Sequence, residues 1–190
     1  TETGSLDAFT ILLSSGRNIA IDGRMDTSQG AGRVFMNAQG SIYMKSMDPI
    51  TAGELFAASV TGIFLRTDVD SLTAQTTGIG LGSDLNLGNY TGSAEIEIHE
   101  VDDVVLNTVY NANGPIRVMA DGTIQAVQIL SATDAPGHNI GLMATGGDLE
   151  VGSVSAGTEH GQISLSASGT IGELVAFDAD ADLTGNMAVV

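Results

Sequence analysis

The chain has 190 residues, with 25 glycines, 43% hydrophobic and 4% aromatic residues, and neither tryptophan nor cysteine. Six basic residues face 23 acidic ones, and the resulting net charge of −17 argues against binding to nucleic acid or to an anionic membrane surface. The absence of cysteine excludes disulfides, and no apolar run is long enough for a transmembrane helix. Much Gly, Ser, Thr, Val and Ile with few aromatics favours short strands joined by tight turns.

A short apolar motif recurs along the chain after a lead-in of residues 1–9. It has the form apolar–any–apolar, so its two apolar side chains share one face of a strand. The motif recurs about every 22 residues, a spacing typical of repeat architectures. It begins at Ile11, Val34, Leu55, Ile79, Ile96, Ile116, Ile140, Ile163 and Met187.

A second short apolar strand follows each first strand at a nearly constant distance, as Ile42 follows Val34 and Ile171 follows Ile163. A turn residue stands just before it, often a glycine such as Gly40 or Gly169, and we expect positive φ at this corner. A third stretch is less regular. It is seen in VDSLTA (Val69–Ala74), VQILSA (Val127–Ala132) and VGSVSA (Val151–Ala156).

These features predict an all-β fold: a single-stranded parallel β-helix, or β-solenoid, with about 22 residues and three short strands per coil. An antiparallel sandwich fits less well, because its hairpins would not keep a constant step between strands. We expect residues 1–190 to form one continuous solenoid of about eight coils, beginning near residues 11, 34, 55, 79, 96, 116, 140 and 163. An incomplete ninth coil would begin at 187, which predicts a longer parent protein or a partner covering that end.

Two stretches far apart in the chain repeat the same pattern in step. They are GRVFMNAQGSI (residues 32–42) and GQISLSASGTI (residues 161–171). We interpret their constant offset as a higher-order repeat of six coils, with matched core positions and matched corner glycines. The outward residue differs between the two copies, Phe35 in the first and Ser164 in the second.

GQISLSASGTI and VDSLTAQTTG resemble the repeats of giant bacterial surface adhesins and filamentous-haemagglutinin-like proteins. The resemblance covers most of residues 11–190. It implies a right-handed coil and an exported protein, extracellular or on the bacterial cell surface, that serves in adhesion or as a filament.

The middle residue of each first strand is expected to point outward. The first three such residues, Leu12, Phe35 and Phe56, are large and apolar, so they form an exposed stripe on successive coils. We expect the stripe to contact another protein chain, a copy of itself, or residues 1–9. A covering loop of the same chain would serve equally well. Further along this column, Glu97 and Arg117 are expected to lie side by side.

The segment FDADADLTGN (residues 177–186) places Asp178, Asp180 and Asp182 at alternate positions. On an extended strand their carboxylates would share one face, which is unfavourable unless a cation lies among them. The sequence therefore offers a candidate calcium site, with a solvated acidic loop as the alternative. It lacks the glycine and terminal glutamate of an EF-hand loop.

Two classes of function fit a solenoid. In the first, the chain is a structural or adhesive segment, a rod-like spacer or filament-forming module that makes weak repeated contacts with other chains or with glycans. In the second, it binds or cleaves polysaccharide, for which Asp102 and Asp103 offer a carboxylate pair. The second expected motif lies several coils away, too far to cooperate. We therefore predict a non-enzymatic protein.

Overall fold

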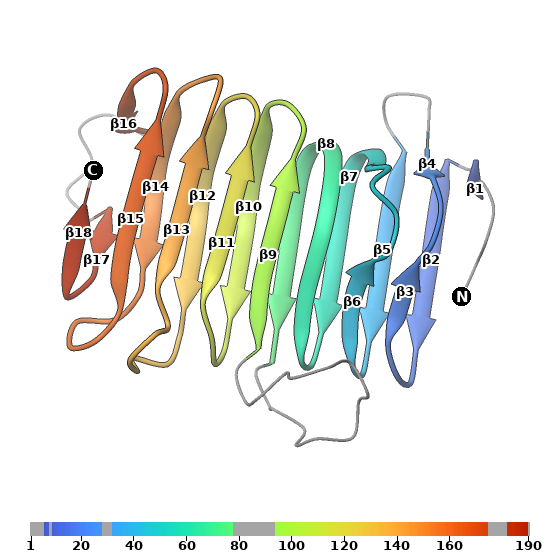
Figure 1. The fold of residues 1–190 in the computed structure, drawn as a ribbon, viewed down its shortest axis with the longest axis horizontal. Coiled ribbons are helices and arrows are strands. Elements are labelled where there is room, and N and C mark those ends of the chain that lie inside the picture. The colour runs from blue at the N-terminus through green and yellow to red at the C-terminus, as the bar shows by residue number, and fades with distance from the viewer. Residues whose placement is uncertain (1–5, 8, 28–31, 78–93, 175–181, 190) are drawn as a thin grey trace.

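The computed structural model describes residues 6–7, 9–27, 32–77, 94–174 and 182–189. Every regular element in these ranges is a strand, and they contain no helix of the length and apolarity that a membrane crossing requires. The strands join into one curled, eighteen-stranded sheet in which all pairings are parallel. The predicted all-β class with parallel strands is confirmed, and the arrangement is consistent with a β-solenoid (Figure 1).

Most strands belong to two rows, which we name ladder A and ladder B. In Figure 1, β9, β11, β13 and β15 of ladder B lie in front of β10, β12 and β14 of ladder A. Ladder A contains β2 (Thr10–Ser15), β5 (Arg33–Ala38), β7 (Ile50–Ser59), the second half of β8 (Gly62–Thr76), β10 (Val104–Asn111), β12 (Ile124–Ser131), β14 (Leu149–Ser155), β16 (Ile171–Glu173) and β17 (Leu183–Thr184). Ladder B contains β3 (Ile19–Ile21), β6 (Ser41–Met44), the first half of β8, β9 (Glu95–Glu100), β11 (Ile116–Ala120), β13 (Ile140–Ala144), β15 (Gln162–Ala167) and β18 (Met187–Val189).

The number of strands per coil changes along the chain. Near the N-terminus a third, short row runs through β1 (Leu6–Asp7), β4 (Met25–Asp26) and the start of β7. Between β9 and β15 there are two longer strands per turn of the chain, because the expected third stretches there are parts of β12 and β14, as the earlier one is part of β8. In the last turn, β16 and β17 are again separate short strands, and both pair with β14. The prediction of three strands per coil therefore holds near the two ends of the described chain and not for the turns between them.

The core lies between the ladders and consists of the inward-facing residues of both. Its clearest feature is a column of isoleucines in ladder B, each in register with the next. All but the first are at most 1% exposed, and burying one such side chain contributes roughly 1.5–3 kcal/mol. The column comprises Ile19, Ile42, Ile63, Ile96, Ile116, Ile140 and Ile163.

The predicted column of first strands is wrong as a single column. Leu55 is in register with Leu72, not with a strand near residue 79, and Ile96 is in register with Ile63. The motif therefore passes from ladder A to ladder B between Leu55 and Ile96. The physical reason is unequal coil length: the coil from Leu55 to Leu72 is shorter than the repeat, and the coil from Ile63 to Ile96 is much longer. Ile79 lies outside the described residues.

The two similar stretches consequently occupy opposite ladders. Val34 belongs to ladder A and Ile163 to ladder B, whereas Ile42 belongs to ladder B and Ile171 to ladder A. Their constant offset thus relates opposite faces of the fold rather than equivalent positions. Both ladders use the same apolar alternation and the same corner, so the pattern does not distinguish them.

The predicted ninth strand at residue 187 is present as β18, which pairs with β15. Its register is displaced by one position from the expected alignment, because Ala188 rather than Met187 faces Ile163. Every residue of β18 is exposed.

A recurring type of corner joins strands of opposite ladders, from ladder B to ladder A at Gly122 and Gly169 and from ladder A to ladder B at Gly40. At one such corner Gly122 precedes Thr123, whose N–H donates to Asp103 Oδ1 of the neighbouring coil at 2.6 Å. A Cβ on Gly122 would lie 2.3 Å from the same oxygen, so the close approach of the neighbouring coil requires glycine here. The positive φ expected from the sequence is not the reason, because Gly122 does not adopt it. The same arrangement recurs with Gly40, Ser41 and Asn18, and with Gly169, Thr170 and Asp148.

A row of buried polar residues follows the ladder A strands at their C-terminal ends. Asn111 is fully buried, and its amide donates to the carbonyl oxygens of Ala94 (2.6 Å) and Pro115 (2.9 Å). Its Oδ1 accepts from the Thr76 hydroxyl and from the Asn113 N–H, both at 3.1 Å. The row, in register, comprises Ser59, Thr76, Asn111 and Ser131.

Candidate functional site

The predicted apolar stripe lies on three adjacent strands of ladder A. Leu12 of β2 is in register with Phe35 of β5, which is in register with Phe56 of β7. The two phenyl rings are stacked, with centroids 4.8 Å apart and planes 6° from parallel. Leu12 is 73% exposed, and the phenylalanines are half-buried. The structure therefore brings together the three residues selected from the sequence.

A shallow hollow accompanies the stripe. Its volume is about 430 Å³, and besides the stripe it is lined by side chains such as Met36, Asn37 and Gln75. The next residue in register after Phe56 is Thr73, so the apolar stripe ends at β8. The side chains of the stripe are suited to apolar and aromatic contacts with another surface.

The outward column of ladder B carries the expected charged pair. Glu97 and Arg117 are in register, as the sequence predicts. The guanidinium of Arg117, however, pairs with a different carboxylate: its Nη1 lies 3.0 Å from Glu95 Oε1. Beside these residues is a second hollow of about 420 Å³, which Met143 and Ser164 also line.

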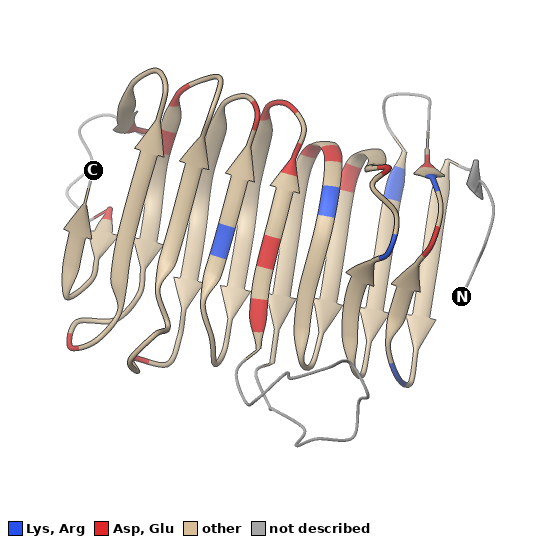
Figure 2. Cartoon of the chain, viewed as in Figure 1, with Lys and Arg blue, Asp and Glu red and all other residues tan. Residues whose placement is uncertain are grey.

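Acidic residues gather along the edge at which β9 ends (Figure 2). The middle of β8 and the end of β9 are in register there, with Thr67 facing Glu100. This register brings together one carboxylate oxygen from each of Asp68, Glu100 and Asp102, all within 4.8 Å of one another. We name these three residues the acidic corner.

Glu100 is the buried member of the acidic corner, with 0% of its surface exposed. Its Oε1 accepts from the backbone N–H of Val101 (3.0 Å) and of Val69 (3.2 Å), whereas its Oε2 has no hydrogen-bond partner among the described residues. The neighbouring Thr67 hydroxyl is likewise buried without a partner of normal hydrogen-bond geometry in the described part of the chain.

Two carboxyl groups of the acidic corner are shifted towards the protonated form. Burial raises the pKa of Glu100 to about 7, although nearby donors, the Thr67 hydroxyl first among them, act in the opposite direction. Burial also raises the pKa of Asp102, and the charges of nearby aspartates add to that effect. Burial of Glu100 and the mutual repulsion of the aspartates around Asp102 thus both disfavour the charged forms of these carboxyl groups.

The sequence missed Asp68 and Glu100. Each is an acidic residue near the C-terminal end of a strand segment of ladder B, and in the sequence such a residue looks like an ordinary solvated side chain. Their proximity depends on the register between β8 and β9, and the coil that joins these strands, from Ile63 to Ile96, is much longer than the others. A constant period does not place these two residues side by side.

The predicted carboxylate pair separates into two different environments. Asp102 belongs to the acidic corner. Asp103 does not: its Oδ1 accepts from the Thr123 backbone N–H at the turn that contains Gly122. Asp103 therefore caps the backbone.

The predicted calcium ligands lie mostly outside the described residues. Nothing is described for Asp178 and Asp180, and Asp182 is half-buried, with its carbonyl oxygen accepting from the Val154 N–H at 2.7 Å. Calcium binding by these three aspartates therefore stays a prediction.

Comparisons of the chain with protein families, curated proteins and solved structures found no match.

Proposed function

We propose that the chain is a structural or adhesive segment of a large repetitive extracellular or cell-surface protein, resembling the bacterial adhesin and filamentous-haemagglutinin-like repeats. It would act as a rod-like spacer or filament-forming module whose outward side chains make weak, repeated contacts. The finer architecture proposed with it is a right-handed β-solenoid with about eight coils of about 22 residues.

The observation that carries the proposal is the Leu12–Phe35–Phe56 stripe on a regular parallel stack. A stack of this kind exposes the same strand positions on successive coils, so neighbouring outward residues form continuous surfaces. Two stacked, half-buried phenyl rings beside a leucine that is 73% exposed provide an apolar surface of the kind that marks protein interaction sites. The occupant proposed is another protein chain or a second copy of this one.

The charge of −17 complements this mode of action. Long-range repulsion between strongly acidic copies opposes non-specific aggregation, so association depends on local complementary patches. Contacts made this way are individually weak and gain strength by repetition along a filament.

The test is sedimentation velocity of the wild-type chain and of a Leu12→Ser/Phe35→Ser/Phe56→Ser variant over a wide concentration range. We expect concentration-dependent association of the wild type and loss of it in the triple variant. Met143→Ser is the matched control, because it removes an exposed apolar side chain (45% exposed) from ladder B. Equal association of all three proteins would contradict a role for the stripe.

Polysaccharide binding or cleavage is the second candidate. The hollow beside Glu97, Arg117 and Met143 supports it, since charged side chains and an apolar floor suit a sugar ring. Incubation with a panel of plant and bacterial polysaccharides separates the alternatives. Release of reducing ends by the wild type would overturn the structural proposal, and binding without turnover would favour an adhesive role.

A further inference from the structure

We propose that the acidic corner, formed by Asp68, Glu100 and Asp102, is a binding site for a divalent cation of the calcium class. The site is distinct from the aspartates at 178–182 and does not depend on the proposed adhesive role. Its three ligands come from β8, from the last residue of β9 and from the turn after it.

The spacing of the carboxylates fits one ion. Calcium binds oxygen at about 2.3–2.6 Å, so two ligands on opposite sides of the ion are about 4.6–5.2 Å apart. The three carboxylate oxygens of the acidic corner all lie within 4.8 Å of one another. Magnesium binds oxygen at about 2.0–2.1 Å and demands a tighter octahedron, so opposed ligands are only about 4.2 Å apart. That limit admits either ion, but three carboxylates from different elements meet the flexible coordination of calcium more easily than the near-ideal octahedron that magnesium demands, so we expect calcium to bind better.

The orphaned oxygen of Glu100 is the observation that points to a ligand. The side chain is fully buried, and two backbone N–H groups hold Oε1. Oε2 belongs to the same carboxylate, which faces Asp68 and Asp102, and no group in the described part of the chain reaches it with normal hydrogen-bond geometry, although the Thr67 hydroxyl is a neighbouring donor. A buried polar atom without a partner costs free energy, and a bound cation would remove that cost.

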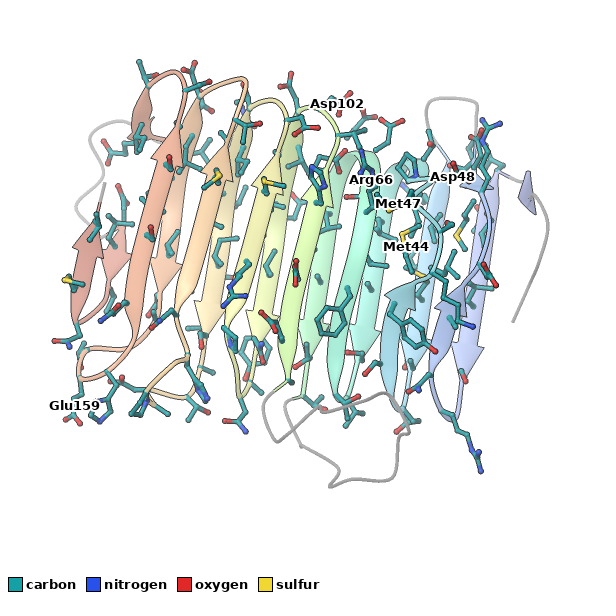
Figure 3. All side chains as sticks on the ribbon, viewed as in Figure 1. Met44, Met47, Asp48, Arg66, Asp102 and Glu159 are labelled. Atoms are coloured by element: carbon teal, nitrogen blue, oxygen red, sulfur yellow. The ribbon has the colours of Figure 1, made fainter. Side chains whose placement is uncertain are left out.

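The charge around the site is uncompensated among the described residues. No lysine, arginine or histidine there forms an ion pair with Asp68, Glu100 or Asp102. Arg66, just before Asp68 in the chain, is labelled below Asp102 in Figure 3 and also forms no ion pair with the three. Asp70 and Asp103 are close enough to add negative charge at Asp102. A divalent cation would neutralise repulsion between these groups.

Exposure increases from Glu100, which is buried, through Asp68, which is half-buried, to Asp102, which is exposed. The acidic corner therefore has a protein wall and an open side, and water would supply the remaining oxygens of a six- to eight-coordinate ion. Three carboxylates with an open side resemble low-affinity extracellular calcium modules, for which the dissociation constant is about 10⁻⁴–10⁻³ M.

The experiment is isothermal titration calorimetry of the chain, residues 1–190, after treatment with chelator. The protein is titrated with calcium chloride and, in parallel, with magnesium chloride. We expect one calcium per chain and weaker binding of magnesium. Glu100→Gln and Asp68→Asn each remove one ligand charge and are expected to weaken binding by roughly tenfold or more. Glu97→Gln is the matched control, because it removes an exposed charge from the same strand without touching the corner, and it should bind as the wild type does.

Asp102→Asn is a second ligand variant that is expected to fold, because this side chain is exposed. Circular dichroism in the presence of chelator verifies the fold of every variant. Asp180→Asn distinguishes the two acidic segments and should leave binding at the acidic corner intact. The proposal is overturned if the wild type gives no calcium response, which is the result expected if a proton satisfies Glu100. Retained binding in Glu100→Gln together with loss in Asp180→Asn would overturn it as well.

Discussion

Asn111 is predicted to be the most sensitive polar position of the fold. Its fully buried side chain forms four hydrogen bonds, donating to Ala94 and Pro115 and accepting from Thr76 and Asn113. A typical intramolecular hydrogen bond contributes about 0.5–1.5 kcal/mol, and leaving a buried partner unsatisfied costs about 1–3 kcal/mol. Replacing Asn111 by alanine should therefore lower the free energy of unfolding by about 3–5 kcal/mol, a large share of the ~5–15 kcal/mol typical of a domain.

The assay is urea unfolding followed by circular dichroism, with Asn37→Ala as the control because Asn37 is an exposed asparagine of ladder A. The control should change the free energy of unfolding by less than about 0.5 kcal/mol. Asn111→Asp should be at least as damaging as alanine at neutral pH, because a carboxylate lacks donors for the Ala94 and Pro115 carbonyl oxygens. A cost below about 1 kcal/mol for Asn111→Ala would refute the network described at this corner.

Two further predictions concern the corners. Gly122→Ala places a Cβ 2.3 Å from Asp103 Oδ1 and 2.7 Å from the Asp103 backbone nitrogen, so we expect a loss of about 1–3 kcal/mol in thermal unfolding; an unchanged melting temperature would contradict the close approach. Asp134 accepts from the backbone N–H groups of residues 158–161, and these hydrogen bonds lower its pKa to about 2. Because the folded-state pKa is depressed, its stabilisation is present above pH ~4 and is lost as pH falls towards 2. Hydrogen exchange of residues 158–161 should show this loss in the wild type, whereas Asp134→Asn should show weak protection at every pH.

The amino-acid sequence predicts the class of fold well because stacked strands repeat one physical requirement. An inward isoleucine must recur wherever a strand crosses ladder B, and it does so at nearly regular intervals except between Ile63 and Ile96. Strand alternation likewise predicts that Leu12, Phe35 and Phe56 point outward as neighbours, and the register confirms it.

The position of each strand within a coil is harder to predict, because the two ladders look alike. Val34 and Ile163 occupy the same sequence pattern and are both buried, yet they belong to opposite ladders. The ladder to which such a strand belongs depends only on the summed length of the coils between the two positions. The short coil that ends at Leu72 and the long coil that ends at Ile96 together move the pattern from one ladder to the other. Local periodicity carries no information about that sum.

The acidic corner was missed for the same reason. The separation of Asp68 and Glu100 is not a whole number of repeats, so an assumed constant period assigns them to different corners. The corner glycines show a related limit. Their positions were predicted, but the reason for glycine lies in a carboxylate or amide of the adjacent coil, which only the register identifies.

The central claim is that the chain acts through contacts made by the outward face of ladder A. Hydrogen exchange of the wild-type chain at low and high protein concentration tests it most directly. We expect association to slow exchange in β2, β5 and β7, which carry Leu12, Phe35 and Phe56, and to leave exchange in β11 and β13 of ladder B unchanged. Slowed exchange confined to β11 and β13, or no change at any concentration with any partner or glycan added, would contradict it.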